Sequence, residues 1–124
     1  MPPKAITKGK SAERELAKLL GDRLGLELSR NLDQTRDGGY DLIGIPGIAL
    51  EVKRCEKLAI NQWWQQALRQ AENAGKTPVL AYRQSRKPWQ FVVPLSWITG
   101  LSTDETATIS LEAFCYLVKA EKLC

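Results

Sequence analysis

Residues 38–53, GGYDLIGIPGIALEVK, decide the fold of this chain. Two short apolar runs flank a Pro-Gly pair, which is the composition of a β-hairpin with a tight turn. Three ionisable residues, Asp41, Glu51 and Lys53, stand at the strand ends, where a buried hairpin has no structural need for charge. The stretch therefore predicts the centre of a sheet and a candidate site upon it.

The positions of these charges constrain the register of the hairpin. Glu51 and Lys53 are two residues apart on one strand, so they share a face. A two-residue turn would pair Asp41 with Val52 and direct the Asp41 carboxyl group to the other face. A three-residue loop or a bulge within residues 44–48 instead sets Asp41 opposite Glu51. We therefore predict an odd or bulged connection.

The composition is that of one soluble globular domain, residues 1–124, with 44% hydrophobic and 26% charged residues. Neither a membrane-length apolar run nor a secretory signal is present, so we expect a cytoplasmic protein, or one in the host cytoplasm if a phage encodes it. The chain has no histidine, which excludes Ser-His-Asp and Cys-His catalysis and His-dependent nucleases. Acid–base chemistry must use carboxylates, lysine or water bound to a metal ion.

The charge is unevenly distributed along the chain. The net charge is +4 overall, and it divides into +6 over residues 1–98 and −2 over residues 99–124. A basic body with an acidic end fits a polyanionic partner such as DNA. We expect residues 1–10 to form a flexible basic arm and residues 99–124 to form a helical extension.

Hydrophobic periodicity around the hairpin predicts the remaining elements. Gly25 and Gly75 stand where the first two predicted helices should stop, and Asn61 and Ser110 stand where the second and third should begin. The resulting order is α-β-β-β-α-β-β-α, an α/β fold with a mixed central sheet flanked by helices. The predicted helices span residues 11–24, 62–74 and 110–120, and the strands outside the hairpin span residues 26–31, 78–82 and 89–95.

The first helix carries a candidate site residue. At 100° per residue, Glu13 falls inside the apolar arc of this helix, whereas Glu15 lies off it. A carboxylate directed at a core must be paired, protonated or bound to a metal ion. Two interpretations stay open: Glu13 is a third acid of the site, or it lies at the rim and pairs with a nearby arginine.

Trp63 and Trp64 are adjacent on the second helix, so they cannot both face the core. We predict that Trp64 is the core residue, together with Ala67, Leu68 and Ala71. Trp63 is then either a packing residue beside the sheet or a surface on which a base stacks.

Asp41 and Glu51 together favour hard cations. Carboxylate oxygens suit Mg²⁺, and Mn²⁺ can take its place, whereas histidine ligands for softer metals are missing. Such ions lower the pKa of bound water and offset phosphate charge, and Lys53 could orient the attacking water or neutralise developing negative charge. Asp41, Glu51 and Glu13 are therefore the candidate metal ligands, and these three with Lys53 are the candidate catalytic residues.

Several basic and amide side chains are candidates for contacts with DNA. Gln34, Thr35 and Arg36 occupy a polar loop before the hairpin and are suited to a phosphodiester, although loops are commonly polar in any case. The full set of predicted DNA-binding residues is Lys8, Lys10, Arg14, Arg30, Gln34, Thr35, Arg36, Arg54 and Gln66.

The pattern YD at residues 40–41 followed by EVK at residues 51–53 resembles the PD-(D/E)xK nuclease motif, with Tyr40 in place of the proline. The wider match over residues 8–95, including KGKSAEREL at residues 8–16, is similar to archaeal-type Holliday junction resolvases and their phage relatives. The resemblance implies a restriction-endonuclease-like core, a homodimer, and Mg²⁺-dependent cleavage of branched double-stranded DNA by paired symmetric nicks. It also places the first acid of the metal site on Glu13.

Two alternatives remain at this stage. The same core also serves nucleases that act on other DNA structures, and a noncatalytic DNA-binding module could retain it. Retention of all four candidate positions, Glu13, Asp41, Glu51 and Lys53, favours an enzyme. We expect no small-molecule cofactor and no membrane partner.

Overall fold

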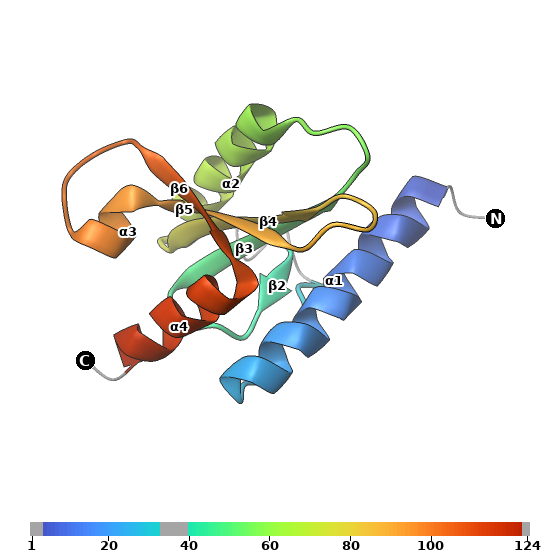
Figure 1. Ribbon diagram of the computed structural model, residues 1–124, viewed down its shortest axis with the longest axis horizontal. Helices are drawn as coiled ribbons and strands as arrows, with labels where there is room; N and C mark the ends of the chain where they lie inside the picture. The colour runs from blue at the N-terminus through green and yellow to red at the C-terminus, as the bar shows by residue number, and fades with distance from the viewer. Residues whose placement is uncertain (1–3, 33–39, 123–124) are drawn as a thin grey trace.

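The computed structural model describes residues 4–32 and 40–122, with the side chains of residues 10–32 and 40–121. Its elements are four helices and six strands in this described part of the chain (Figure 1). Within the same part, no helix is both long enough and apolar enough to cross a membrane. The elements in chain order are α1 (Lys4–Leu24), β1 (Ser29–Arg30), β2 (Leu42–Ile43), β3 (Ile48–Arg54), α2 (Ile60–Ala74), β4 (Thr77–Arg83), β5 (Gln90–Pro94), α3 (Leu95–Thr99), β6 (Thr106–Ser110) and α4 (Leu111–Lys122).

The strands form one mixed sheet in the order β1-β2-β3-β4-β5-β6. Among the described strands, only β3 and β4 pair in parallel, because α2 carries the chain back between them, and the other neighbouring pairs are antiparallel. Helices α1 and α4 cover one face of the sheet and α2 covers the other (Figure 1). This arrangement confirms the predicted α/β class and the mixed sheet flanked by helices.

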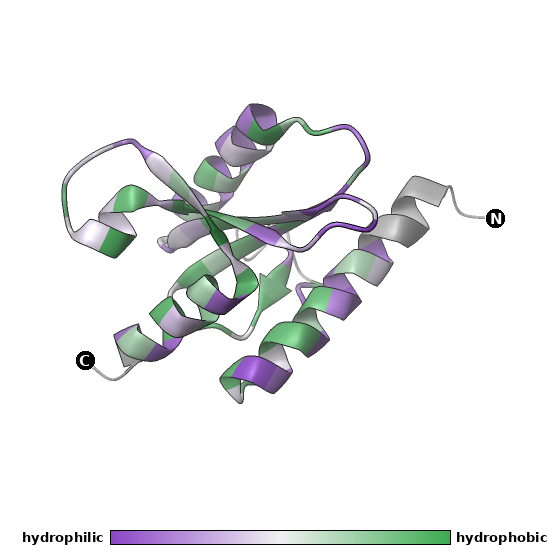
Figure 2. Ribbon diagram, viewed as in Figure 1, coloured by the Kyte–Doolittle hydropathy of each residue, from purple (hydrophilic) through white to green (hydrophobic). Residues whose placement is uncertain are grey.

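The main core lies between the sheet and the helices α1 and α4. Leu16 and Leu20 of α1 are fully buried there, and Phe91 of β5 stacks on Phe114 of α4 with ring centroids 4.5 Å apart. Two smaller clusters fill the α2 side. The apolar stripe of α1 is visible in the hydropathy colouring, and polar residues occupy its solvent side (Figure 2).

The register of the central hairpin is the predicted one. Leu42 of β2 pairs with Leu50 of β3, so Asp41 lies opposite Glu51. The connection departs from a simple two-residue turn, since Gly44 has a φ of 131° and the Ile48 amide bonds the Ile45 carbonyl at 3.3 Å. A Cβ on Gly44 would lie 2.4 Å from the Glu27 carbonyl oxygen, which explains why glycine stands at this position.

The two ends of the chain differ from expectation. Helix α1 begins at Lys4, so the flexible arm predicted for residues 1–10 is wrong for residues 4–10, and residues 1–3 lie outside the described part. The C-terminal segment is more than helical, since β6 pairs with β5 along five residues before α4 begins. The strand was missed because Thr106–Ser110 reads as a polar loop with only two apolar residues.

The helix boundaries match the predicted caps in part. Gly25 and Gly75 end α1 and α2 in the left-handed conformation, as predicted. Ser110 caps α4 through its hydroxyl group, which accepts a hydrogen bond from the Ala113 amide at 3.1 Å. Asn61 is not the cap of α2, because the helix begins one residue earlier, at Ile60.

The assignment of the adjacent tryptophans is also wrong. Trp63 is the buried residue, 9% exposed, and it packs on Leu80 and Val92, whereas Trp64 is half-buried. The buried stripe of α2 runs through Trp63, Ala67 and Ala71, which share one face because they are four residues apart.

We predict that Phe114→Ala lowers the free energy of unfolding by about 3 to 5 kcal/mol, since it removes a fully buried ring stacked on Phe91. Tyr116→Ala on the same helix is the matched control, because that ring is 73% exposed, and it should change stability by about 0.5 kcal/mol at most. Urea unfolding measures both. Similar losses in the two variants would show that α4 does not belong to the core.

Candidate active site

The two acids of the hairpin meet at the centre of the sheet. Asp41 is 8% exposed and Glu51 is 2% exposed, and their side chains are joined by a hydrogen bond. The Oδ2 atom of Asp41 also accepts a hydrogen bond from the Val52 amide at 2.7 Å. The Oε2 atom of Glu51 is buried and has no hydrogen-bond partner among the described residues. This buried oxygen atom is therefore available to a ligand or to a residue outside the described part of the chain.

The pKa of Glu51 is raised to about 10. Burial of the carboxyl group is the main cause, and the hydrogen bond and negative charge of Asp41 raise it further. The positive charge of Lys53 acts in the opposite direction. Without a cation, the Glu51 carboxyl group is therefore protonated at neutral pH.

Asn31 holds the backbone around Asp41 and was not singled out in the sequence. Its side-chain Nδ2 donates to the Tyr40 carbonyl at 2.9 Å, and its amide donates to the Asp41 carbonyl at 2.8 Å. Asn31 is 4% exposed. Tyr40 is fixed again at its hydroxyl group, which accepts a hydrogen bond from Lys76 at 2.7 Å. The available signal was a polar residue at the end of a predicted strand, where polar residues are common in any case.

Glu13 lies near this pair but is engaged by an arginine. Its Oε2 atom accepts a hydrogen bond from Arg30 Nε at 2.6 Å, and both side chains are partly buried. Burial raises the pKa of Glu13, Arg30 opposes that effect, and the charge of Asp41 adds to it. Glu13 is therefore close enough to Asp41 for the charge of Asp41 to raise its pKa. Glu13 also pairs with an arginine, as the interpretation of Glu13 as a rim residue requires.

Lys53 follows Glu51 by two residues on β3 and points from the same face. Its side chain is half-buried, and its charge acts on the Glu51 carboxyl group. The parallel register sets Glu51 opposite Leu80 and Lys53 opposite Tyr82. The hairpin and the parallel pair thus bring Asp41, Glu51 and Lys53 together.

The donor set fits a hard divalent cation. Asp41 and Glu51 offer oxygen ligands only. The Oε2 atom of Glu51, which has no hydrogen-bond partner among the described residues, could act as a ligand atom beside Asp41. Among the described side chains, no three acidic, cysteine or histidine residues converge into a ready-made metal cluster. Mg²⁺ is commonly held by one or two carboxylates while it keeps several waters, so a two-carboxylate site suits it.

The predicted DNA-contact residues separate into several groups. Arg14 and Lys18 of α1 line an open groove of about 650 Å³ with Arg30. Lys10 is exposed on α1, and its charge lowers the pKa of Glu13. Gln66 is half-buried on α2, and no described hydrogen bond joins it to the site.

Arg54 ends β3 half-buried, and its Nε atom has no partner among the described residues. The remaining predicted contacts cannot be placed. Gln34, Thr35 and Arg36 lie outside the described residues, as does the side chain of Lys8.

A mixed sheet whose central hairpin carries Asp41 and the Glu51-Val52-Lys53 sequence defines a nuclease of the PD-(D/E)xK type. A family model described as "Phage putative PDDEXK endonuclease" matches residues 4–122. The chain belongs to this phage PD-(D/E)xK endonuclease family.

One solved structure with a similar fold is that of Archaeoglobus fulgidus Hjc, a Holliday junction resolvase from an archaeal hyperthermophile. It shares 23% sequence identity with this chain, the alignment covers 85% of each chain, and the TM-score is 0.53. Among curated protein sequences, none matches. The structural likeness establishes a shared fold.

The buried pair predicts a stability that depends on pH. Because the pKa of Glu51 is about 10 in the folded protein and 4.5 in the unfolded chain, ionisation opposes folding increasingly as the pH rises from 4.5 to 10. In metal-free buffer at pH 7, Glu51→Gln should therefore stabilise the protein by roughly 3 kcal/mol. The gain should disappear below about pH 4.5 and grow toward pH 10.

Thermal unfolding at several pH values measures this effect. The exposed Glu72→Gln on α2 is the matched control and should show little change across the range. A Glu51→Gln variant that is less stable than the unsubstituted protein at pH 8 would contradict the raised pKa.

Proposed function

We propose that this protein is a metal-dependent endodeoxyribonuclease that resolves four-way DNA junctions by paired symmetric nicks. The observation that carries the proposal is the buried Asp41–Glu51 pair with an unpartnered carboxylate oxygen and Lys53 on the same face. No packing role requires that combination. Perturbed acids grouped with a cation are typical of catalytic sites.

Asp41 and Glu51 are the proposed ligands of Mg²⁺, for which Mn²⁺ can substitute. The cation, when bound, supplies positive charge that lowers the pKa of a water nucleophile and offsets the charge of the phosphate. Glu51 would release its proton to solvent in order to act as a ligand. A hydrogen bond from the Val52 amide fixes the carboxyl group of Asp41, and the hydrogen bonds of Asn31 fix its backbone.

Lys53 is the proposed electrostatic catalyst. Its ammonium group can donate a hydrogen bond to a phosphate oxygen or to the attacking water, and so stabilises the negative charge that develops as the phosphodiester is attacked. Lys53 lies on the same face of β3 as Glu51, so it would lie on the same side of the strand as a cation held by Glu51.

Glu13 is the proposed third acid, on the condition that Arg30 releases it. An incoming phosphate is a group that can take the Arg30 guanidinium, because arginine binds phosphate and carboxylate in the same bidentate geometry. Binding of DNA would thus free Glu13 to complete the site. Lys10, Arg14 and Arg54 are the proposed phosphate contacts among the described residues.

The solved structure of similar fold is a Holliday junction resolvase, which makes a four-way junction the first substrate to test. Two symmetric cuts across one junction require two sites related by a two-fold axis, so we propose a homodimer. The enzyme would act in the host cytoplasm, where phage DNA replicates and branches.

Cleavage of a labelled four-way junction in Mg²⁺ tests the proposal. We expect paired nicks, loss of cleavage with EDTA, and preference over linear duplex at equal salt. Asp41→Asn should reduce the rate by at least about 100-fold because it removes a ligand charge, while its amide oxygen can still accept the Val52 hydrogen bond. Lys53→Ala should show a loss of similar size.

Binding of the junction should stay near its original strength in both variants, and Glu72→Gln should retain full activity as the matched carboxylate-to-amide control. Unchanged cleavage in Asp41→Asn would remove the assigned site. Equal cleavage of linear duplex would retain the nuclease but remove the junction preference.

A further inference from the structure

We propose that the turn between β4 and β5, residues 84–88, is a rigid basic element that grips the DNA backbone beside the active site. The inference rests on the proposed function and adds a contact surface to it. The turn has the sequence QSRKP, with Arg86 and Lys87 at its tip, both exposed. Neither cation has an acidic partner among the described side chains.

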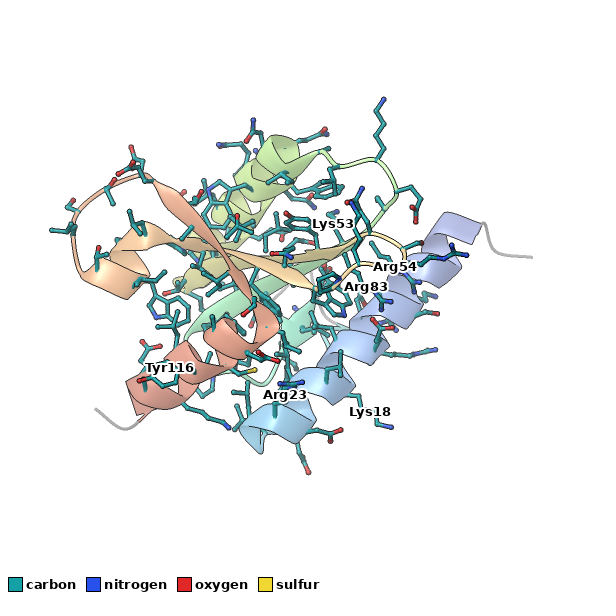
Figure 3. The ribbon with its side chains drawn as sticks, viewed as in Figure 1. Lys18, Arg23, Lys53, Arg54, Arg83 and Tyr116 are labelled. Carbon is teal, nitrogen blue, oxygen red and sulfur yellow. The ribbon has the colours of Figure 1, made fainter. Side chains whose placement is uncertain are left out.

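The fold places this turn at the end of the sheet where Lys53, a proposed catalytic residue, lies. Because β3 and β4 run in parallel, the C-terminal ends of both strands lie at the same end of the sheet. There Lys53 pairs with Tyr82 and Arg54 pairs with Arg83. Lys53, Arg54 and Arg83 lie near one another at this end, next to the N-terminal half of α1 (Figure 3). The turn continues from β4 just beyond them.

One acid braces the base of the turn against α1. The Oε2 atom of Glu15 accepts hydrogen bonds from Arg83 Nη1 at 2.6 Å and from Trp89 Nε1 at 3.0 Å. Arg83 also donates from Nε to the Lys87 carbonyl at 3.1 Å. Glu15 thus links the start and the end of the turn to the first helix.

A second acid braces the other side. Glu56, in the segment after β3, accepts hydrogen bonds from the amide and hydroxyl groups of Ser85, and its carbonyl accepts from Gln84 Nε2 at 2.9 Å. Arg86 sits at φ 63°, an uncommon backbone conformation for a residue with a side chain. The bracing contacts hold that conformation in place.

These contacts divide the charges into two sets. The acids engage Arg83 and the polar groups of the turn, whereas Arg86 and Lys87 are left exposed and Arg54 keeps an unpartnered buried Nε atom. Directly opposite like charges such as Arg54 and Arg83 are unfavourable unless anions lie between them. Glu15 supplies one anion, and a DNA phosphate is the proposed second.

A rigid turn with exposed cations should bind a polyanion of regular spacing more tightly than a flexible turn would, because the rigid turn loses less conformational entropy on binding. The proposed occupant is the phosphate backbone of a duplex arm whose scissile bond lies at Asp41 and Glu51.

The test uses the double variant Arg86→Gly with Lys87→Ala. Glycine accommodates φ 63° without strain, so the turn should keep its shape while it loses both charges. Affinity for a fluorescein-labelled four-way junction is measured from about 50 to 200 mM salt. Each lost phosphate contact should lower the slope of log affinity against log salt by about one unit, so we expect a decrease of about two.

The matched control is Arg23→Ala with Lys119→Ala, which removes the same two charge types from the opposite end of the molecule. Arg23 is exposed there, near the end of α1 and away from Arg54 and Arg83 (Figure 3). The control should leave the salt slope unchanged. The single substitution Arg86→Lys, which keeps a positive charge at this position, should preserve the original slope.

Single-turnover cleavage at saturating enzyme separates this proposal from the proposed function. We expect the Arg86→Gly, Lys87→Ala variant to cleave within about twofold of the unsubstituted rate once bound, because neither residue belongs to the catalytic set. A salt slope equal to that of the control would overturn the contact proposal while cleavage still supports the nuclease. A reduced slope without any cleavage by the unsubstituted protein would support the contact and remove the proposed function.

Discussion

The structure depends on one costly arrangement, the burial of the Glu51 carboxyl group against Asp41 in the middle of a sheet. Two acids in such contact cannot both ionise without a cation, so the pair retains a proton and the protein loses stability as the pH rises. Neutral residues of similar shape would avoid that loss. We therefore interpret the arrangement as a proposed pair of metal ligands, whose unfavourable electrostatics a bound cation would relieve.

The surrounding fold keeps this pair in register. A glycine that tolerates φ 131° shapes the connection of the hairpin, and Asn31 fixes the backbone on both sides of the Tyr40–Asp41 peptide. Helix α2 returns the chain so that β3 and β4 run in parallel, which gathers Lys53, Arg54 and the β4–β5 turn at one end of the sheet. The proposed catalytic residues and the proposed DNA contact are thus brought together by a single topological feature, the parallel β3–β4 pair, which is the only parallel pair among the described strands.

The hairpin, its register and the association of Asp41 with Glu51 could be predicted because period-two alternation and a fixed charge spacing are local properties. Strand β6 and the early start of α1 could not, since a polar threonine-rich strand and a Gly-containing basic helix end are stabilised by their neighbours rather than by their own pattern. The buried tryptophan was misassigned because Trp63 and Trp64 lie at the two edges of the arc that contains Ala67 and Ala71, so helical periodicity alone does not choose between them. Asn31 and Glu15 gain their roles from partners 9 or more residues away, which no local pattern contains.

The central claim is that the protonated Asp41–Glu51 pair is a cation site. Isothermal titration of Mn²⁺ into the protein at pH 7, repeated in buffers of different ionisation enthalpy, tests it most directly. The account predicts binding coupled to release of about one proton, since a carboxylate must lose its proton to become a ligand, and loss of that binding in Asp41→Asn. Binding without proton release, or equal binding by Asp41→Asn, would contradict it.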